Sequence, residues 1–218
     1  MLQQYRTVYR GGEGEYIEKK SRFIATVEPI DTEEEALEYI EGLRKRYWDA
    51  RHNCYAFVIG EGMRIQRFSD DGEPGGTAGK PILDVLLGED IHNVLIVVTR
   101  YFGGTLLGTG GLVRAYGRAA RDGLQNSIII TKEHGFIILV KTDYNGIGKI
   151  QYLLAQRGYH ILKSEYTQEV VLEVLVPLPQ IEELQQAINE VTAARAVFQK
   201  KKEVYFATEQ SQPLVFDI

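Results

Sequence analysis

The chain has 218 residues, of which 44% are hydrophobic, and a formal net charge of −5. This length suits one large domain or two small ones, and the acidic balance argues against a protein that coats nucleic acid non-specifically, so any nucleic-acid contact must use a local basic patch. A single cysteine excludes an internal disulfide framework, and no apolar run reaches the roughly 20 residues of a membrane span. Because the first residues also lack the apolar core of a signal peptide, the sequence predicts a cytoplasmic protein without membrane contact.

The first half of the chain alternates short apolar runs with amphipathic segments. Asp31 or Thr32 is expected to cap a helix, because three glutamates follow in its first turn, where the helix dipole favours carboxylates. The run 94–99, VLIVVT, is the most β-prone in the chain and predicts a central strand. The expected strands are 21–30, 53–59, 63–68, 94–99 and 127–132, and the expected helices are about 32–47, 77–87 and 112–125.

The second half predicts six elements in the order βαββαβ, which is the ferredoxin-like order. They are a strand at 136–142, a helix at 145–157, strands at 159–166 and 169–176, a helix at 177–191 and a strand at 196–207. The short tail after them is expected to fray or to dock. The sequence therefore predicts an α+β fold with two domains, residues 1–133 and 134–218.

Half of the 22 glycines lie between Ser69 and Arg121. They fall at turns, where glycine permits positive φ and close backbone approach, so they predict a surface built from backbone. The acidic loop Asp70–Pro74 within this stretch has two interpretations: a Mg²⁺ or acid–base site, or a turn whose aspartates cap the next helix, which we favour. Its continuation, Gly75–Lys80, is not a P-loop, because prolines stand where that motif needs glycine and a hydroxyl.

The turn Gly108–Gly111 stands at the start of a predicted helix, where free N–H groups favour an anion. A tight turn that packs helix on sheet is an equal alternative. Along the helix Arg114, Arg118 and Arg121 share one face. Such a stripe is usually solvated, but with Arg100 beside it the stripe would hold phosphate.

Two further sets of residues have weaker signals. Tyr101 and Phe102 could stack on a base or peptide, and one of the two is expected to pack in the core or at a sheet edge instead. His52 and Cys54 point to one face of a strand, where Cys54 is expected as a buried apolar residue and His52 as a ligand contact. The three lysines at 200–202 are expected to keep a sheet edge soluble, and no zinc spacing occurs.

Four ordered motifs carry a resemblance to the YigZ/IMPACT family. They are SRFIA at 21–25, DARHNCYAF at 49–57, RFSDDGEPGGTAGKPIL at 67–83 and NVLIVVTRYFGGTLLGTGGLVRAY at 93–116. The resemblance implies a first domain like domain 2 of ribosomal protein S5, and a second domain like the last domain of elongation factor G. Eukaryotic members regulate translation by binding the activator of a stress-responsive kinase. This chain resembles the bacterial type, which lacks their RWD domain, so the resemblance implies a translation-linked binding protein.

These inferences combine into one leading hypothesis: a binding protein without catalytic residues, metal or cofactor, which contacts RNA or the ribosome, with a protein as a further candidate partner. An enzyme acting on a phosphorylated small molecule at Asp70–Glu73 and Gly108–Gly111 is the first alternative. A regulator that binds only protein, through an apolar patch at Tyr101 and Phe102, is the second. The expected ligand-binding residues are His52, Asp70, Asp71, Gly72, Glu73, Gly75, Lys80, Arg100, Tyr101, Gly103, Gly104, Gly108, Gly110, Arg114 and Arg118.

Overall fold

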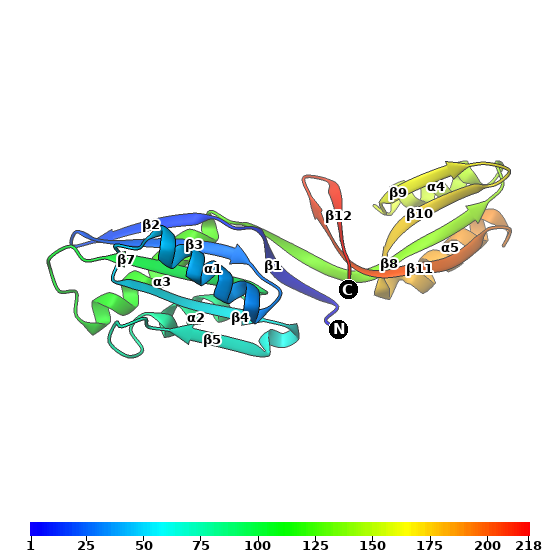
Figure 1. Ribbon diagram of the computed structural model, residues 1–218. Coiled ribbons are helices and arrows are strands. Elements are labelled where there is room, and N and C mark those ends of the chain that lie inside the picture. The colour runs from blue at the N-terminus through cyan, green and yellow to red at the C-terminus, as the bar shows by residue number, and fades with distance from the viewer. The chain divides into compact units, whose positions relative to one another are not determined.

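The computed structural model describes residues 1–218, which divide into two compact units. The N-terminal unit is residues 5–130, and the C-terminal unit combines residues 131–218 with residues 1–4 (Figure 1). The chain passes between them inside the single strand β8 (Ile128–Thr142), whereas the sequence placed the boundary at 133/134.

The N-terminal unit is built on a five-stranded antiparallel sheet with the order β2-β3-β7-β4-β5. Its central strand is the VLIVVT run, as the sequence predicted. A further strand, β1, pairs in parallel with the short strand β6, where Arg6 lies opposite Ile91. The strands are β1 (Gln4–Arg10), β2 (Glu13–Glu18), β3 (Ser21–Pro29), β4 (His52–Ile59), β5 (Ile65–Ser69), β6 (Ile91–His92) and β7 (Val94–Tyr101).

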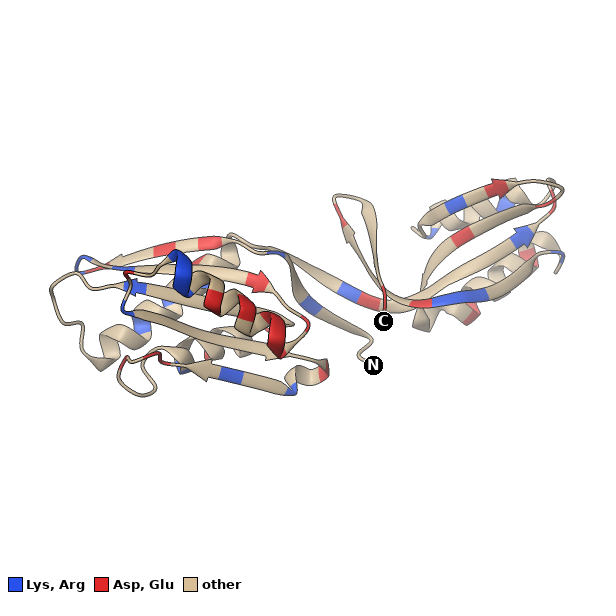
Figure 2. Cartoon of the chain, viewed as in Figure 1, with Lys and Arg blue, Asp and Glu red and all other residues tan.

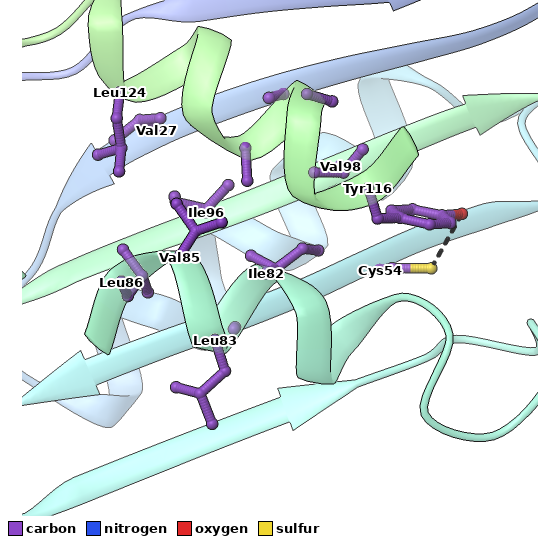
Figure 3. Close-up of a cluster of buried hydrophobic side chains, with 14 of the residues drawn as sticks. Val27, Cys54, Ile82, Leu83, Val85, Leu86, Ile96, Val98, Tyr116 and Leu124 are labelled. Atoms are coloured by element: carbon purple, nitrogen blue, oxygen red, sulfur yellow. Dashed lines mark hydrogen bonds between the residues drawn. The ribbon is translucent and has the colours of Figure 1, made fainter. Parts of the chain in front are cut away.

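Helices cover both faces of this sheet, because alternate residues of the central strands are apolar on both sides. The helix α1 (Glu33–Arg46) buries Ile40 and Leu43 against Leu95 and Val97 of one face. The opposite face packs against α2 (Gly79–Gly88) and α3 (Thr109–Gln125) around the intervening residues of the same strand, such as Ile96 (Figure 3). A 3₁₀ turn, η1 (Glu61–Met63), connects β4 to β5.

The start of α1 confirms the predicted cap. Thr32 Oγ1 accepts the backbone N–H of Glu35 at 3.1 Å, and the Glu35 carboxylate accepts the N–H of Asp31 at 2.7 Å. The first bond satisfies a donor of the first helical turn that has no partner inside the helix, and the second ties the residue before the cap to that turn. Acidic residues follow in the first turn and basic residues stand in the last, so both ends suit the helix dipole (Figure 2).

The C-terminal unit has the element order β8-α4-β9-β10-α5-β11, as predicted, and the sheet order β11-β8-β10-β9 with every pair antiparallel. Its helices bury Ile150 and Leu184 in a core with strand residues such as Val140. The elements are α4 (Ile147–Gln156), β9 (Ile161–Tyr166), β10 (Val170–Pro177), the 3₁₀ turn η2 (Leu178–Gln180), α5 (Ile181–Thr192), β11 (Val197–Glu209) and β12 (Gln212–Phe216).

Several elements differ from the sequence prediction. The strands expected at 127–132 and 136–142 form one strand, because Gly135 between them keeps the ladder and pairs with Pro177 and with Val204. The tail forms β12, a hairpin with β11. The strands β1 and β2 were not predicted. None of the helices combines the length and the apolar character that crossing a membrane requires.

Candidate functional site

The acidic loop caps α2, which is the simpler of its two predicted roles. The Asp70 carboxylate accepts the backbone N–H groups of Gly76, Ala78 and Gly79 at 2.7, 2.9 and 2.8 Å. Burial acts to raise the pKa of Asp70, but these three N–H donors outweigh it and the pKa lies below its ordinary value. Asp70 is therefore an ionised structural cap, opposite in direction to the raised pKa of a general acid.

Asp71 and His52 fasten this loop to the sheet. The Asp71 carboxylate accepts the backbone N–H of Asn53 at 2.7 Å and binds the guanidinium of Arg44 at 2.8 Å. His52 Nδ1 lies 2.9 Å from the carbonyl oxygen of Asp71, and Gly72 turns beneath the ring with a φ of 87°. Both side chains thus hold the loop in place through contacts within the protein, and this structural role requires no ligand.

Glu73 is the centre of a buried polar network. Its Oε1 accepts a hydrogen bond from Arg100 Nη1 at 2.6 Å and another from Tyr116 Oη at 2.8 Å. Cys54 Sγ extends the network, since it lies 3.3 Å from Tyr116 Oη and 2.9 Å from the carbonyl oxygen of Asp70 (Figure 3). Burial raises the pKa of both Cys54 and Tyr116 far above their ordinary values. Cys54 consequently stays a thiol, as its predicted role in the core requires.

The prediction that Arg100 is presented at the surface beside the arginine stripe is wrong. Only 6% of Arg100 is exposed, its Cζ lies 5.4 Å from the ring centroid of Phe23 and 5.7 Å from that of Phe102, and its Nε has no hydrogen-bond partner. Arg100 points towards the side of the sheet that α2 and α3 cover, because it shares a strand face with Ile96. Its charge neutralises Glu73, so it is not available to a phosphate.

The other predicted residues are scattered over the unit. Lys80 is exposed and pairs with Asp84, and Tyr101 Oη donates to Asp49 at 2.8 Å on the face opposite Arg100. Gly75 meets nothing within 4 Å of a built Cβ, and Gly104 and Gly108 have φ values of 84° and 71°. Gly103 must be glycine for lack of space, because a Cβ there would lie 2.0 Å from the backbone of Lys20. None of these positions lines the groove along α3.

The arginine stripe of α3, in contrast, lines a surface groove. Arg114, Arg118 and Arg121 face a groove of about 370 Å³ that also contains Lys19, from the turn between β2 and β3. We call this the arginine groove; Tyr16, Glu18, Leu107, Gly111 and Ala115 complete its wall. Gly110, another predicted ligand-binding residue, lies in the first turn of α3, where a Cβ would stand 3.5 Å from Arg114 Nη1.

The positive charges that line the groove outnumber the carboxylates beside them. Arg118 Nε binds Asp122 at 2.9 Å, and Glu18 accepts the hydroxyl of Tyr16 at 2.8 Å. That hydrogen bond raises the pKa of Tyr16. No carboxylate lies within ion-pair distance of Arg114, Arg121 or Lys19. Four cations against two carboxylates leave an anion-attracting surface.

Glycines one turn earlier shape this surface. The Arg121 guanidinium lies 3.7 Å from where a Cβ of Gly117 would stand. In the same way, the Arg114 guanidinium lies 3.5 Å from where a Cβ of Gly110 would stand. Helical side chains lean towards the N-terminus, so a small residue at i−4 lets Arg114 and Arg121 lie along the helix. These two guanidinium groups therefore lie one after the other along the exposed side of α3.

Comparisons with known proteins cover nearly the whole chain. Residues 19–124 match the Impact N-terminal domain, and residues 140–195 match a domain of unknown function, DUF1949. The chain is 39% identical to the IMPACT family member YvyE of Bacillus subtilis over 196 residues. This aligned stretch is 90% of each of the two chains.

The chain belongs to the IMPACT family.

Two further similarities agree with this membership in the IMPACT family. The IMPACT family member YigZ of Escherichia coli is 41% identical over 167 residues, which are 76% of this chain and 82% of that one. A crystal structure described as that of a hypothetical protein has a TM-score of 0.59 and 33% identity over 93% of this chain and 99% of its own. All four cations of the arginine groove lie inside the stretch that matches the IMPACT N-terminal domain.

Proposed function

We propose that this IMPACT family member is a translation-linked binding protein whose N-terminal unit contacts RNA, free or in the ribosome, through the arginine groove. The observation that carries the proposal is the row of cations along α3: Arg114 and Arg121 have no carboxylate partner and face one groove with Lys19. Guanidinium groups match phosphate oxygens with two parallel hydrogen bonds, which favours phosphate over other anions.

The length of the row favours a chain of phosphates over a single one. A helix rises 1.5 Å per residue, so seven residues separate Arg114 from Arg121 by about 10 Å along the axis of α3. A lone phosphate would use only part of such a row, whereas a nucleic-acid backbone presents charge along all of it. The acidic loop gives no comparable support to a phosphate-processing enzyme, because its three carboxylates are engaged in the cap, the Arg44 contact and the buried network.

The two folds give the proposal its link to translation. The order β11-β8-β10-β9 with two crossing helices supports a ferredoxin-like C-terminal unit. We extend this to the domain pair that the family resemblance implies, an S5-like domain followed by one like the last domain of elongation factor G. Both of those occur in proteins of the ribosome cycle, and this analogy of fold motivates the choice of RNA as the polyanion.

The test compares two variants that lose equal charge from the same unit. Arg114→Ala with Arg121→Ala empties the groove of its unpaired arginines, whereas Arg64→Ala with Arg67→Ala removes two exposed arginines near and on β5. We expect the groove variant to bind labelled RNA at least tenfold more weakly in fluorescence anisotropy and to co-sediment less with ribosomes, while the β5 variant behaves as wild type. Equal affinity of both variants would overturn the proposal.

A further inference from the structure

Phe102 is a large apolar residue held at the surface. Half of it is exposed, in the loop that follows β7. Its ring is backed by the guanidinium of Arg100, which Glu73 fixes in turn with a 2.6 Å ion pair. Arg100 is itself placed against Phe23 on β3. The ring thus rests on a buried, rigid support, and its orientation does not have to be fixed by a ligand.

Backbone contacts place this ring close to the arginine groove. Gly103, the next residue, donates its N–H to Ser21 Oγ at 3.1 Å and lies so close to Lys20 that no side chain would fit. Lys19, which lines the groove, precedes that contact in the same turn, and Leu107 of the Phe102 loop also lines it. Phe102 therefore stands beside the end of the groove where α3 begins.

We propose that the arginine groove takes single-stranded RNA, with phosphates along Arg114 and Arg121 and one unstacked base on the face of Phe102. This inference rests on the proposed function and specifies its ligand. An exposed aromatic ring beside a cationic groove is the combination that binds single strands, since every base has a face to stack while the backbone follows the charge. A duplex keeps its bases stacked inside, so it offers Phe102 nothing to hold.

The geometry also assigns the buried network a task. Glu73 and Arg100 do not touch the RNA; they position the ring from behind. Stacking should therefore depend on Phe102 without changing the number of phosphates bound. The effects of the two kinds of variant can therefore be separated. A Phe102 variant should change RNA affinity without changing its salt dependence, whereas Arg114→Ala/Arg121→Ala should change both the affinity and its salt dependence.

The experiment measures affinities of wild type, Phe102→Leu, Phe102→Trp and Leu106→Ala for a single-stranded RNA and for a duplex of equal length. Leucine keeps apolar packing against Arg100 but removes the ring, tryptophan keeps a stacking face, and Leu106 is an 82% exposed control in the same loop. We expect wild type to prefer the single strand, and Phe102→Leu to lose about tenfold on it alone. Phe102→Trp and Leu106→Ala should retain wild-type binding.

The outcomes separate this inference from the function on which it rests. Equal wild-type affinity for the two RNAs, or wild-type binding of the single strand by Phe102→Leu, overturns the stacking inference. If the arginine double variant still weakens RNA binding in that case, the proposed function stands without a base stacked on Phe102. If the arginine double variant binds as wild type, the proposed function itself fails.

Discussion

Removing Glu73 should destabilise the N-terminal unit more than any change at its surface. Its carboxylate is the ion-pair partner of Arg100, and the two side chains are only 4% and 7% exposed. Glu73→Ala would leave the Arg100 guanidinium buried with neither Nη1 nor Nε paired, and would deprive Tyr116 of its acceptor. Breaking a buried pair from one side costs about 3–5 kcal/mol, because the remaining charge stays desolvated.

Cys54 provides an assay specific to this unit. It is the only cysteine of the chain, it is fully buried in the network, and its raised pKa keeps it unreactive until the unit opens. Where opening is fast and reversible, the rate of thiol labelling follows the population of the open form. A loss of about 3–5 kcal/mol should then accelerate labelling by roughly two to three and a half orders of magnitude.

Two companion variants test the electrostatic reasoning. Glu73→Gln keeps an acceptor for Tyr116 but removes the negative charge, so it should fall between wild type and Glu73→Ala. Glu73→Leu combined with Arg100→Met removes both charges and should recover much of the lost stability, because no ion is left unpaired. If Glu73→Ala labels at the wild-type rate, and its thermal midpoint by circular dichroism is also unchanged, the ion pair does not stabilise the unit and the reasoning is refuted.

Three further predictions follow from single contacts. Asp70→Ala should cost about 0.5–2 kcal/mol at neutral pH by loss of the α2 cap. Because folding lowers the pKa of Asp70, the folded state holds fewer protons, so this advantage of wild type should begin to shrink as pH falls below about 4 and be lost as pH passes through the lower folded-state pKa. A pH-independent difference in denaturant titrations would contradict this. Gly103→Ala should lower the free energy of unfolding by about 1–3 kcal/mol, because its Cβ would clash with the backbone of Lys20. Gly75→Ala places its Cβ in open space and should leave the thermal midpoint near that of wild type. Equal thermal midpoints of the two variants would be evidence against the close approach of Gly103 to Lys20. Glu18→Gln should tighten RNA binding by about two- to fivefold at low salt, since it removes a negative charge from the groove, and weaker binding would argue that Glu18 contacts the ligand.

Strong local patterns made much of the fold predictable. The central strand β7 has eight residues of which seven are buried, and the Thr32 cap lies three residues before a glutamate, so both have a signature in a short window. The β2 strand has none, because its buried position is Gly14, where a Cβ would lie 2.4 Å from the backbone of Gly123 on α3. A strand that contacts a helix through glycine lacks the apolar alternation from which strands are recognised.

The same missing signal limited the prediction of the site. The arginine stripe followed from helical spacing, but Lys19 and Tyr16 belong to the unpredicted strand β2 and its turn, so the groove itself could not be anticipated. Arg100 was misplaced for a different reason. Its partner Glu73 is 27 residues away in sequence, and nothing local distinguishes an arginine bound for an internal ion pair from one that faces solvent. Alternation along β7 places Arg100 on the face of Ile96, but both faces of this strand are buried, so alternation gave no sign of the internal ion pair.

The salt dependence of RNA affinity tests the central claim most directly. Each phosphate contact to a single strand contributes a slope of about 0.7 to the plot of log K against log salt concentration. Wild type and the Arg64→Ala/Arg67→Ala control should share one slope, and Arg114→Ala/Arg121→Ala should lower its magnitude by about 1.4. A groove variant with the wild-type slope would contradict the claim that these two arginines hold phosphates.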